Sequence, residues 1–246
     1  MISQRIANLS EGAPRLLASL LKSHGTIQAA EPDQVIFLEG ESAENVQMVL
    51  SGTVRCCTIA EDGRRHIFSF ASAGRFVGLP GITVRHFTAE AVTKAKLQVL
   101  SRASFEALLA ERQEVAIAVQ ELLRSELRMR ERHLLRLASL PAEPRLLSFL
   151  AELARQSGPD MRTDSGFVTL PMSRREIADH LGLTLETVSR AFTMLRRRGQ
   201  LELRSKSVFR LPDELQPKAE MRAEHQPVPA QTDMTDALYE GVLARS

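Results

Sequence analysis

The pattern of apolar and polar positions divides the chain into a strand-rich front part and a helical back part. Between about residues 34 and 100, short runs of β-type residues alternate with turns, at 34–40, 45–60, 64–71, 76–84, 88–92 and 96–100. Glycines stand in the breaks, where hairpin turns need a positive φ: Gly40, Gly52, Gly63 and Gly74. This spacing predicts a β-roll. An amphipathic helix over the roll is predicted from four preceding leucines: Leu16, Leu17, Leu20 and Leu21.

Residues 113–138 predict one long helix, because they contain neither glycine nor proline and repeat apolar residues at helical spacing. The apolar positions are Ala116, Val119, Leu123, Leu127, Leu134 and Leu137. Arg130 interrupts this stripe, which therefore indicates a seam in a bundle or a dimer rather than a long independent coiled coil. The alternative is that the stripe is buried against the chain's own front domain.

Residues 171–202 predict two short helices around a tight turn, the pattern of a helix-turn-helix. Ser173 and Glu176 have the S-x-x-E spacing of a capping box at the start of the first helix. Gly182 allows the turn, and Thr184 is placed to cap the second helix. Inward-facing residues are predicted on both helices: Ile177, Ala178, Leu181, Val188, Phe192 and Leu195.

The segments on either side of this motif complete a second domain. A helix over 142–157 is predicted to begin it, after a boundary marked by Pro141. After Gly199, apolar and polar residues alternate through Phe209 and predict a small hairpin, the wing of a winged helix. Beyond residue 211 the chain is rich in Pro, Gln and Ala, and we expect a mostly mobile tail over 212–246.

The second helix of the motif carries three polar residues on its outer face, near its N-terminal end. Glu186, Ser189 and Arg190 have i, i+3, i+4 spacing and project together. Arginine can pair with guanine O6 and N7, glutamate can accept from a cytosine amino group, and serine can meet a base edge. These residues therefore predict a base-reading surface for a DNA major groove. The alternative is a solvated helix with an internal Glu186–Arg190 pair.

Positive charge is concentrated in this part of the chain. Between residues 171 and 210, nine basic residues stand against four acidic ones, Glu176, Asp179, Glu186 and Glu202, whereas the whole chain has a net charge of only +2. The nine are Arg174, Arg175, Arg190, Arg196, Arg197, Arg198, Arg204, Lys206 and Arg210. A local surplus of this kind is typical of a surface that binds DNA phosphates.

The segment 171–175 followed by 183–190 resembles the CRP/FNR superfamily, and within it the FixK-like branch of the FNR-type regulators. The resemblance implies an α+β architecture with a cyclic-nucleotide-binding-like β-roll over 1–112, a dimerisation helix over 113–138 and a winged helix-turn-helix domain over 141–211. It places Glu186, Ser189 and Arg190 at the family's base-reading positions. Secondary DNA contacts are expected from Ser173, Arg174, Thr184, Leu185, Thr187, Arg196 and Lys206.

The function implied by the resemblance is a homodimeric transcription activator of genes for low-oxygen or related metabolism. It would read a TTGAT-N4-ATCAA-type palindrome and act with RNA polymerase. Two recognition helices in successive major grooves explain why a palindrome is expected. The dimer seam would be formed by Ala116, Val119, Leu123, Leu127 and Leu134.

The residues that bind a cyclic nucleotide or an iron-sulfur cluster in relatives are replaced or missing in this sequence. In nucleotide-binding relatives a glutamate grips the ribose and an Arg–Ser pair neutralises the cyclic phosphate, but here Leu79 and Phe87–Thr88 stand at those positions. Binding without cyclic nucleotide is therefore expected, since the phosphate would lack a cation. The N-terminal cysteines of the iron-sulfur relatives are missing as well, so no cofactor and no metal site are expected.

Control of DNA binding by another ligand, or by oxidation of cysteines, is an alternative. Haem, nitric oxide or a metabolite could control a regulator of the same architecture, with His66 or His86 as a haem ligand. Cys56 and Cys57 could form a redox-sensitive pair of thiols. The competing expectation for the cysteines is that they point to opposite faces of a strand, one in the core and one partly exposed.

Length and composition set outer limits on this interpretation. A chain of 246 residues with 43% hydrophobic content has room for two domains with their own cores. There is no apolar run of membrane-spanning length and no secretory signal pattern, so a cytoplasmic protein without a membrane partner is expected. No catalytic constellation of the Ser/His/Asp, HExxH, Walker or GxGxxG type is found, so an enzyme is not expected.

Overall fold

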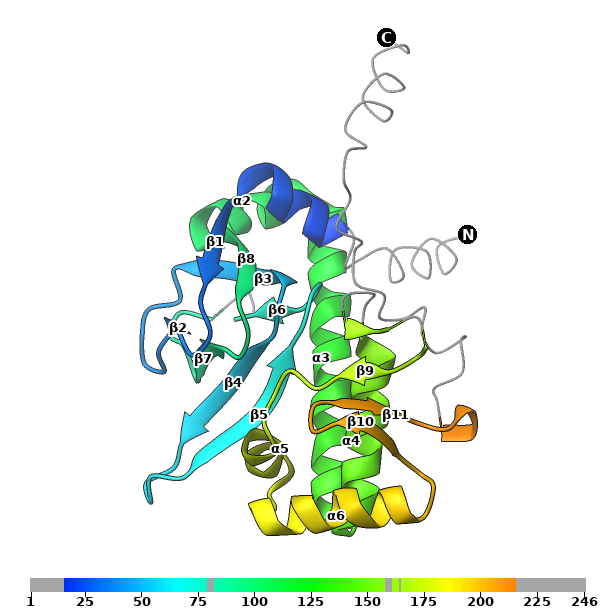
Figure 1. Cartoon of the computed structure of the whole chain (residues 1–246). Coiled ribbons are helices and arrows are strands. Elements are labelled where there is room, and N and C mark those ends of the chain that lie inside the picture. Colours follow the sequence, from blue (N-terminus) through cyan, green and yellow to red (C-terminus); the bar gives the residue numbers. More distant parts are fainter. Residues whose placement is uncertain (1–15, 79–81, 158–160, 164, 216–246) are drawn as a thin grey trace.

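The computed structural model describes residues 16–78, 82–157, 161–163 and 165–215. A strand-rich domain and a mostly helical domain lie on the two sides of one long helix, α3 (Gln113–Ser139), which runs through the middle of Figure 1. This confirms the predicted α+β fold, with a β-roll in front and a helix-turn-helix domain behind.

The front domain is a roll of two four-stranded antiparallel sheets. The first sheet has the order β1 (Thr26–Ala30), β8 (Ala95–Ser101), β3 (Asn45–Ser51), β6 (Phe76–Val77). The second has the order β2 (Val35–Phe37), β7 (Thr88–Ala91), β4 (Val54–Ile59), β5 (Arg65–Ala71). Residues of both sheets, among them Val49, Cys56 and Leu97, form one buried apolar cluster. The roll therefore has its own core.

Most of the predicted runs correspond to strands, and Gly40, Gly52, Gly63 and Gly74 all have positive φ, between 78° and 87°. Run 76–84 forms only the short β6 and an isolated bridge from Val84 to Ser42, and residues 79–81 lie outside the described part. Strand β1 was not predicted. Four of its five residues are exposed, so it lacks the alternation that marks a half-buried strand.

A second apolar cluster lies on the first sheet of the roll. It joins the helical residues 16–24, α2 (Arg102–Glu111) and the first turns of α3. The predicted N-terminal helix over the roll is thus found for residues 16–24, whereas residues 1–15 lie outside the described part. Val119 belongs to this cluster and is only 8% exposed, so its assignment to a dimer seam is wrong. The start of α3 packs against its own roll, and Val119 is on the packed side.

The second domain packs three helices and a small sheet around one core. The helices are α4 (Ala142–Gln156), α5 (Arg174–Leu181) and α6 (Leu185–Arg197). The sheet has the order β10 (Glu202–Ser205), β11 (Val208–Arg210), β9 (Val168–Thr169). The predicted hairpin is β10–β11, while the two-residue β9 was not predicted.

The predicted tail begins later than residue 212. Asp213–Leu215 form a 3-10 helix, η2, and Leu215 packs against the core of the second domain. The rest of the expected mobile tail, residues 216–246, lies outside the described part. Within the described residues, none of the helices is both long and apolar enough to cross a membrane.

Candidate nucleic-acid interface

Local hydrogen bonds define where both helices of the helix-turn-helix begin. The Ser173 hydroxyl accepts from the Glu176 backbone N–H, and the Glu176 carboxylate accepts from the Ser173 backbone N–H, which completes the capping box of α5. Gly182 ends α5 with a φ of 62°, a conformation that glycine adopts without strain. Thr184 then caps α6 by accepting from the Thr187 N–H. The sequence thus determines the turn geometry residue by residue.

The three predicted base-reading residues lie on the outer side of α6, opposite its buried face. Val188, Phe192 and Leu195 of that face are almost fully buried in the domain core. Glu186 and Arg190 are exposed, and Ser189 is half-buried. Among the described residues neither the Glu186 nor the Arg190 side chain has an ion pair or hydrogen bond, so the two charges are not bound to each other. Both side chains are available to an external partner.

The residues expected to make secondary DNA contacts fall into two groups. Thr184, Leu185, Arg196 and Lys206 are exposed, with Lys206 in the turn between β10 and β11. Three others have internal roles. The hydroxyls of Ser173 and Thr187 bond within the caps of α5 and α6, and the Arg174 guanidinium lies 4.5 Å from the centre of the Phe192 ring. Arg174 is therefore held against the domain core, so its guanidinium is less available to DNA than that of an exposed arginine.

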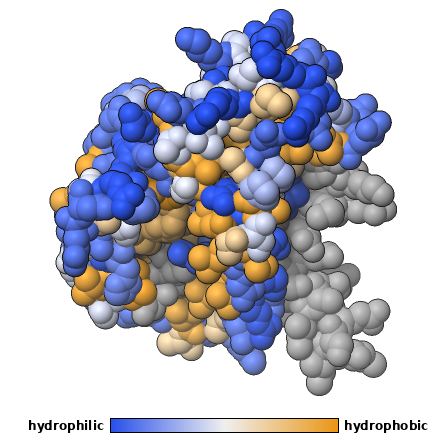
Figure 2. All heavy atoms as spheres, turned by 90° about the horizontal axis from the view of Figure 1, so that it is seen from below, coloured by the Kyte–Doolittle hydropathy of each residue, from blue (hydrophilic) through white to orange (hydrophobic). Residues whose placement is uncertain are grey.

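Part of the basic surplus is neutralised within the domain. Arg198 pairs with Glu143 of α4, and Arg210 pairs with Glu202 of the neighbouring strand. In the described residues no ion pair neutralises six exposed side chains: Arg175, Arg190, Arg196, Arg197, Arg204 and Lys206. Seen from the side where α6 lies, the surface has hydrophilic atoms along most of its rim and hydrophobic atoms gathered towards its middle (Figure 2). The exposed basic side chains without an ion pair suit contacts with DNA phosphates.

The helix-turn-helix is docked on the roll through a buried cluster of charges that sequence reasoning missed. Arg55 of β4 donates to Glu90 at 2.6 Å, to Glu176 at 2.9 Å and to Asp33 at 3.0 Å. Burial lowers the pKa of Arg55, but the hydrogen bonds to the three carboxylates outweigh this and raise it. Because Glu176 is the capping residue of α5, one carboxylate serves both the helix start and the contact between domains.

Two further contacts support the same docking. Arg65 of β5 pairs with Asp179 of α5 at 3.1 Å. His180 of α5 lies 2.9 Å by its Nδ1 from the Ile67 carbonyl oxygen of β5, and its ring stacks on His133 of α3 at 4.3 Å. Burial lowers the pKa of His180 to about 3 and that of His133 to about 4. Both rings are therefore neutral at neutral pH, which favours their stacking.

The positions considered for nucleotide or haem binding lie in different surroundings. Phe87, which stands where the resemblance places a phosphate-pairing arginine, packs against Phe37 and Phe68 with ring centres 5.4 and 5.1 Å away. Leu79 lies outside the described part. His66 and His86 are both exposed. No group of three or more His, Cys, Asp or Glu side chains is arranged for a metal ion among the described residues.

The cysteines differ from the expectation that one of them is partly exposed. Cys56 and Cys57 are both buried. Burial raises the pKa of Cys56 to about 12, and it also raises the pKa of Cys57. Strand β4 is covered on both sides, because Cys56 lies in the roll core while Arg55 contacts α5. Both thiols are therefore protonated and shielded, which disfavours a rapid redox role.

The predicted seam of α3 divides into a buried and an exposed part. Val119 is buried, as described above, whereas Ala116 is exposed. The larger residues are exposed too: Leu123 at 40%, Leu127 at 58% and Leu134 at 64%. Four of the five predicted residues thus form an apolar face that a single chain leaves uncovered.

Comparisons with known proteins agree with this architecture. Residues 27–112 match the family model of the cyclic nucleotide-binding domain, and residues 144–216 match that of the Crp-like helix-turn-helix domain. The chain is 39% identical over 188 residues to the nitrogen fixation regulation protein FixK of Azorhizobium caulinodans, covering 76% of each chain. It is 32% identical over 176 residues to the transcriptional activator protein FnrL of Cereibacter sphaeroides, covering 70% of this chain and 71% of that one.

A solved structure extends the likeness to three dimensions. The structure of FixK2 from Bradyrhizobium japonicum is similar with a TM-score of 0.72 and 34% identity, over 79% of this chain and 98% of that one. These relatives are transcription regulators and not enzymes. The chain accordingly belongs to the CRP/FNR family of DNA-binding transcription regulators, as a FixK-like member.

Proposed function

We propose that two copies of this protein bind a TTGAT-N4-ATCAA-type palindrome without cyclic nucleotide and activate transcription together with RNA polymerase. The observation that carries the proposal is the outer face of α6, where Glu186 and Arg190 are exposed and unpaired beside Ser189. Arginine and glutamate at this spacing suit guanine and cytosine edges, respectively. The relatives include FixK and FnrL, and FnrL is named as a transcriptional activator, which supports activation rather than repression.

Dimerisation is proposed from the uncovered face of α3. Ala116, Leu123, Leu127 and Leu134 repeat at intervals of seven, four and seven residues, which places them along one side of the helix. Large side chains exposed in a row lose their contact with water when a second copy of the helix covers them. A two-fold dimer would also place two α6 helices on successive turns of the major groove, as a palindrome requires.

Binding without cyclic nucleotide is supported by the packing of Phe87. An aromatic ring between two other phenylalanines offers no charge to a phosphate at this position. A cytoplasmic location follows from the proposed partners, since DNA and RNA polymerase are found there in bacteria.

The test is binding of the purified full-length protein to a TTGAT-N4-ATCAA duplex and to a scrambled duplex, at one fixed salt concentration. Selective binding without added nucleotide is expected. Arg190→Ala should weaken binding to the palindrome by about 1 to 3 kcal/mol, or about 5- to 150-fold, and leave the scrambled duplex nearly unchanged.

Arg197→Ala is the matched control, because Arg197 is equally exposed and unpaired but lies at the other end of α6. A phosphate contact has no sequence information, so this change should weaken binding to both duplexes alike. Equal effects of the two substitutions on both duplexes would refute base reading by Arg190.

A further inference from the structure

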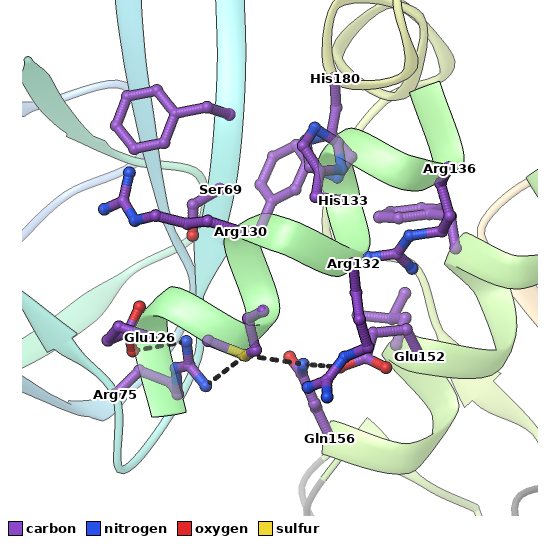
Figure 3. A pocket seen from close by; sticks show the side chains of 15 residues that line it. Ser69, Arg75, Glu126, Arg130, Arg132, His133, Arg136, Glu152, Gln156 and His180 are labelled. Atoms are coloured by element: carbon purple, nitrogen blue, oxygen red, sulfur yellow. Dashed lines mark hydrogen bonds and ion pairs between the residues drawn. The ribbon is translucent and has the colours of Figure 1, made fainter. Parts of the chain in front are cut away.

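A small cavity lies where the roll and the DNA-binding domain meet on α3. Its volume is about 90 Å³, and it is lined by β5 and Arg75 from the roll, by the middle of α3, by α4, and by His180 of α5. Figure 3 shows the lining side chains around α3, with Arg130 on the side of the strands and Arg132, Arg136 and Glu152 on the side of α4. No residue predicted from the sequence to bind DNA or to mediate dimerisation lines it.

The lining carries more positive than negative charge. Arg75, Arg130, Arg132 and Arg136 stand against Glu126 and Glu152, an excess of two positive charges. Both carboxylates already have a partner, because Glu126 pairs with Arg75 at 2.7 Å and Glu152 pairs with Arg155.

Three guanidinium groups therefore remain without a carboxylate partner among the described residues. They belong to Arg130, Arg132 and Arg136. Arg130 lies over the Phe68 ring at 5.2 Å. A cluster of uncompensated cations around a cavity is a site where an anion would lower the electrostatic free energy.

Buried polar atoms in the same place lack hydrogen-bond partners. They are Nε of Arg136 and Nδ1 of His133, whose residues both line the cavity. Among the described residues, the Arg136 guanidinium otherwise makes only a 3.5 Å contact, to the Ser148 carbonyl oxygen. Burial lowers the pKa of Arg136, and although Glu152 raises it, the positive charges of Arg132 and Arg155 lower it further. The unsatisfied Nε–H of Arg136 is a donor, and an acceptor group would remove its free-energy cost.

The size of the cavity limits what it can hold. Its volume is about 90 Å³. Sites for drug-sized or nucleotide-sized ligands are several times larger. The occupant that fits both the charge and the volume is a small oxyanion.

The cavity also remains accessible in the proposed dimer. Met129, His133 and Arg136 line it and follow i, i+4, i+7 spacing on one side of α3. At 100° per residue, this side lies roughly opposite the one that carries Leu127 and Leu134. A second copy seated on the leucines would therefore leave the cavity within each chain.

From this geometry we propose that the cavity is an effector site for a small oxyanion of the phosphate class. The anion would be held by Arg132 and Arg136, which lie about one turn apart on the helix to which both domains are attached. Because Arg75 and β5 belong to the roll and His180 belongs to the helix-turn-helix, the bound anion stabilises the docked arrangement of the two domains. Anion binding and DNA binding are then coupled, and each changes the other's affinity by the same factor.

The test is a calorimetric titration of the full-length protein with inorganic phosphate, in a chloride buffer of constant ionic strength and without DNA. We expect one saturable site per chain. Arg132→Gln and Arg136→Gln should each weaken phosphate binding by about 10- to 150-fold, the equivalent of one charge-assisted hydrogen bond. Arg132 is exposed, so its substitution leaves folding intact even if that of Arg136 does not.

Arg128→Gln is the matched control, since Arg128 is an exposed arginine of α3 that does not line the cavity. It should bind phosphate like the unmodified protein. Absence of saturable phosphate binding, or equal binding by all three variants, would overturn the proposal. Saturable binding of succinate without a response to phosphate would overturn the assigned ligand class. Because DNA is left out of the titration, its outcome does not depend on the proposed base reading.

Discussion

Replacing Arg55 tests whether buried charges hold the two domains together. Its side chain is 9% exposed and meets three carboxylates, of which Glu90 is 20% exposed, Glu176 10% and Asp33 79%. Methionine has a similar length and no charge, so Arg55→Met fills most of the space and leaves Glu90 and Glu176 buried without their cation. The free energy of unfolding should fall for that reason.

The magnitude follows from the burial of each pair. Removing one partner of a buried ion pair costs about 3 to 5 kcal/mol, because the remaining charge is uncompensated. The exposed Asp33 adds less than about 1 kcal/mol. With a dependence on urea of about 3 kcal/mol per M for a chain of this size, the unfolding midpoint should fall by about 1 to 2 M.

The assay is urea denaturation of the full-length protein, followed by circular dichroism. Arg64→Met is the control, since Arg64 pairs with Asp62 and the two side chains are 77% and 48% exposed. This pair is open to solvent and contributes little, so the midpoint should move much less than that of Arg55→Met. Equal shifts for Arg55→Met and Arg64→Met would refute the reasoning.

A double substitution separates the orphaned charge from lost packing. Glutamine at position 176 keeps the capping box, because glutamine serves at this position as glutamate does. Adding Glu176→Gln to Arg55→Met should therefore recover part of the lost stability. If the double variant is less stable than Arg55→Met, the stabilisation does not come from the Arg55–Glu176 charge pair.

Three further predictions concern the other features described above. Leu127→Glu should convert the dimer into monomers in analytical ultracentrifugation without loss of secondary structure, and a variant that sediments as a dimer would disprove the α3 interface. The free energy of unfolding should fall as the pH drops below about 6.5. In the unfolded chain His133 and His180 become protonated near that pH, whereas in the folded chain they stay neutral down to their pKa values of about 4 and 3. Below about pH 6.5 each histidine should lower the free energy of unfolding by about 1.4 kcal/mol per pH unit. The measurement is the urea midpoint at pH 7 and at pH 5. A His180→Phe variant whose midpoint falls as much between these pH values as that of the unmodified protein would contradict this cause. Cys56 and Cys57 should react slowly with a thiol reagent in the native protein and rapidly in urea, and native labelling at the rate of a free cysteine would show that β4 is not covered on both sides.

The helix-turn-helix could be predicted from the sequence because its geometry is local. The capping box of Ser173 and Glu176, the turn at Gly182 and the cap at Thr184 each depend on residues no more than four positions apart. The exposure of Glu186 and Arg190 follows from the same helical periodicity, since the buried residues of α6 define its opposite side.

Contacts between distant segments could not be predicted in this way. Arg55 and Glu176 are 121 positions apart, and neither residue type indicates its partner. Val119 has the same spacing as the seam residues. It is nevertheless buried in the cluster formed with residues 16–24 and α2, because the first turns of α3 pack on the roll. Cys57 is buried as well, and its position in the sequence did not reveal this, because burial depends on how the strands and helices pack.

The double use of Glu176 bears on how freely such regulators exchange their parts. A chimera that attached this DNA-binding domain to a roll without an arginine equivalent to Arg55 would keep a nearly buried carboxylate at the first turn of α5 and supply no cation for it. Such a chimera would undock its domains or accept a weakened start of the helix-turn-helix. Roll and DNA-binding domain are thus matched to each other at a single side chain, and inheritance of the domains as a pair would be favoured over recombination between them.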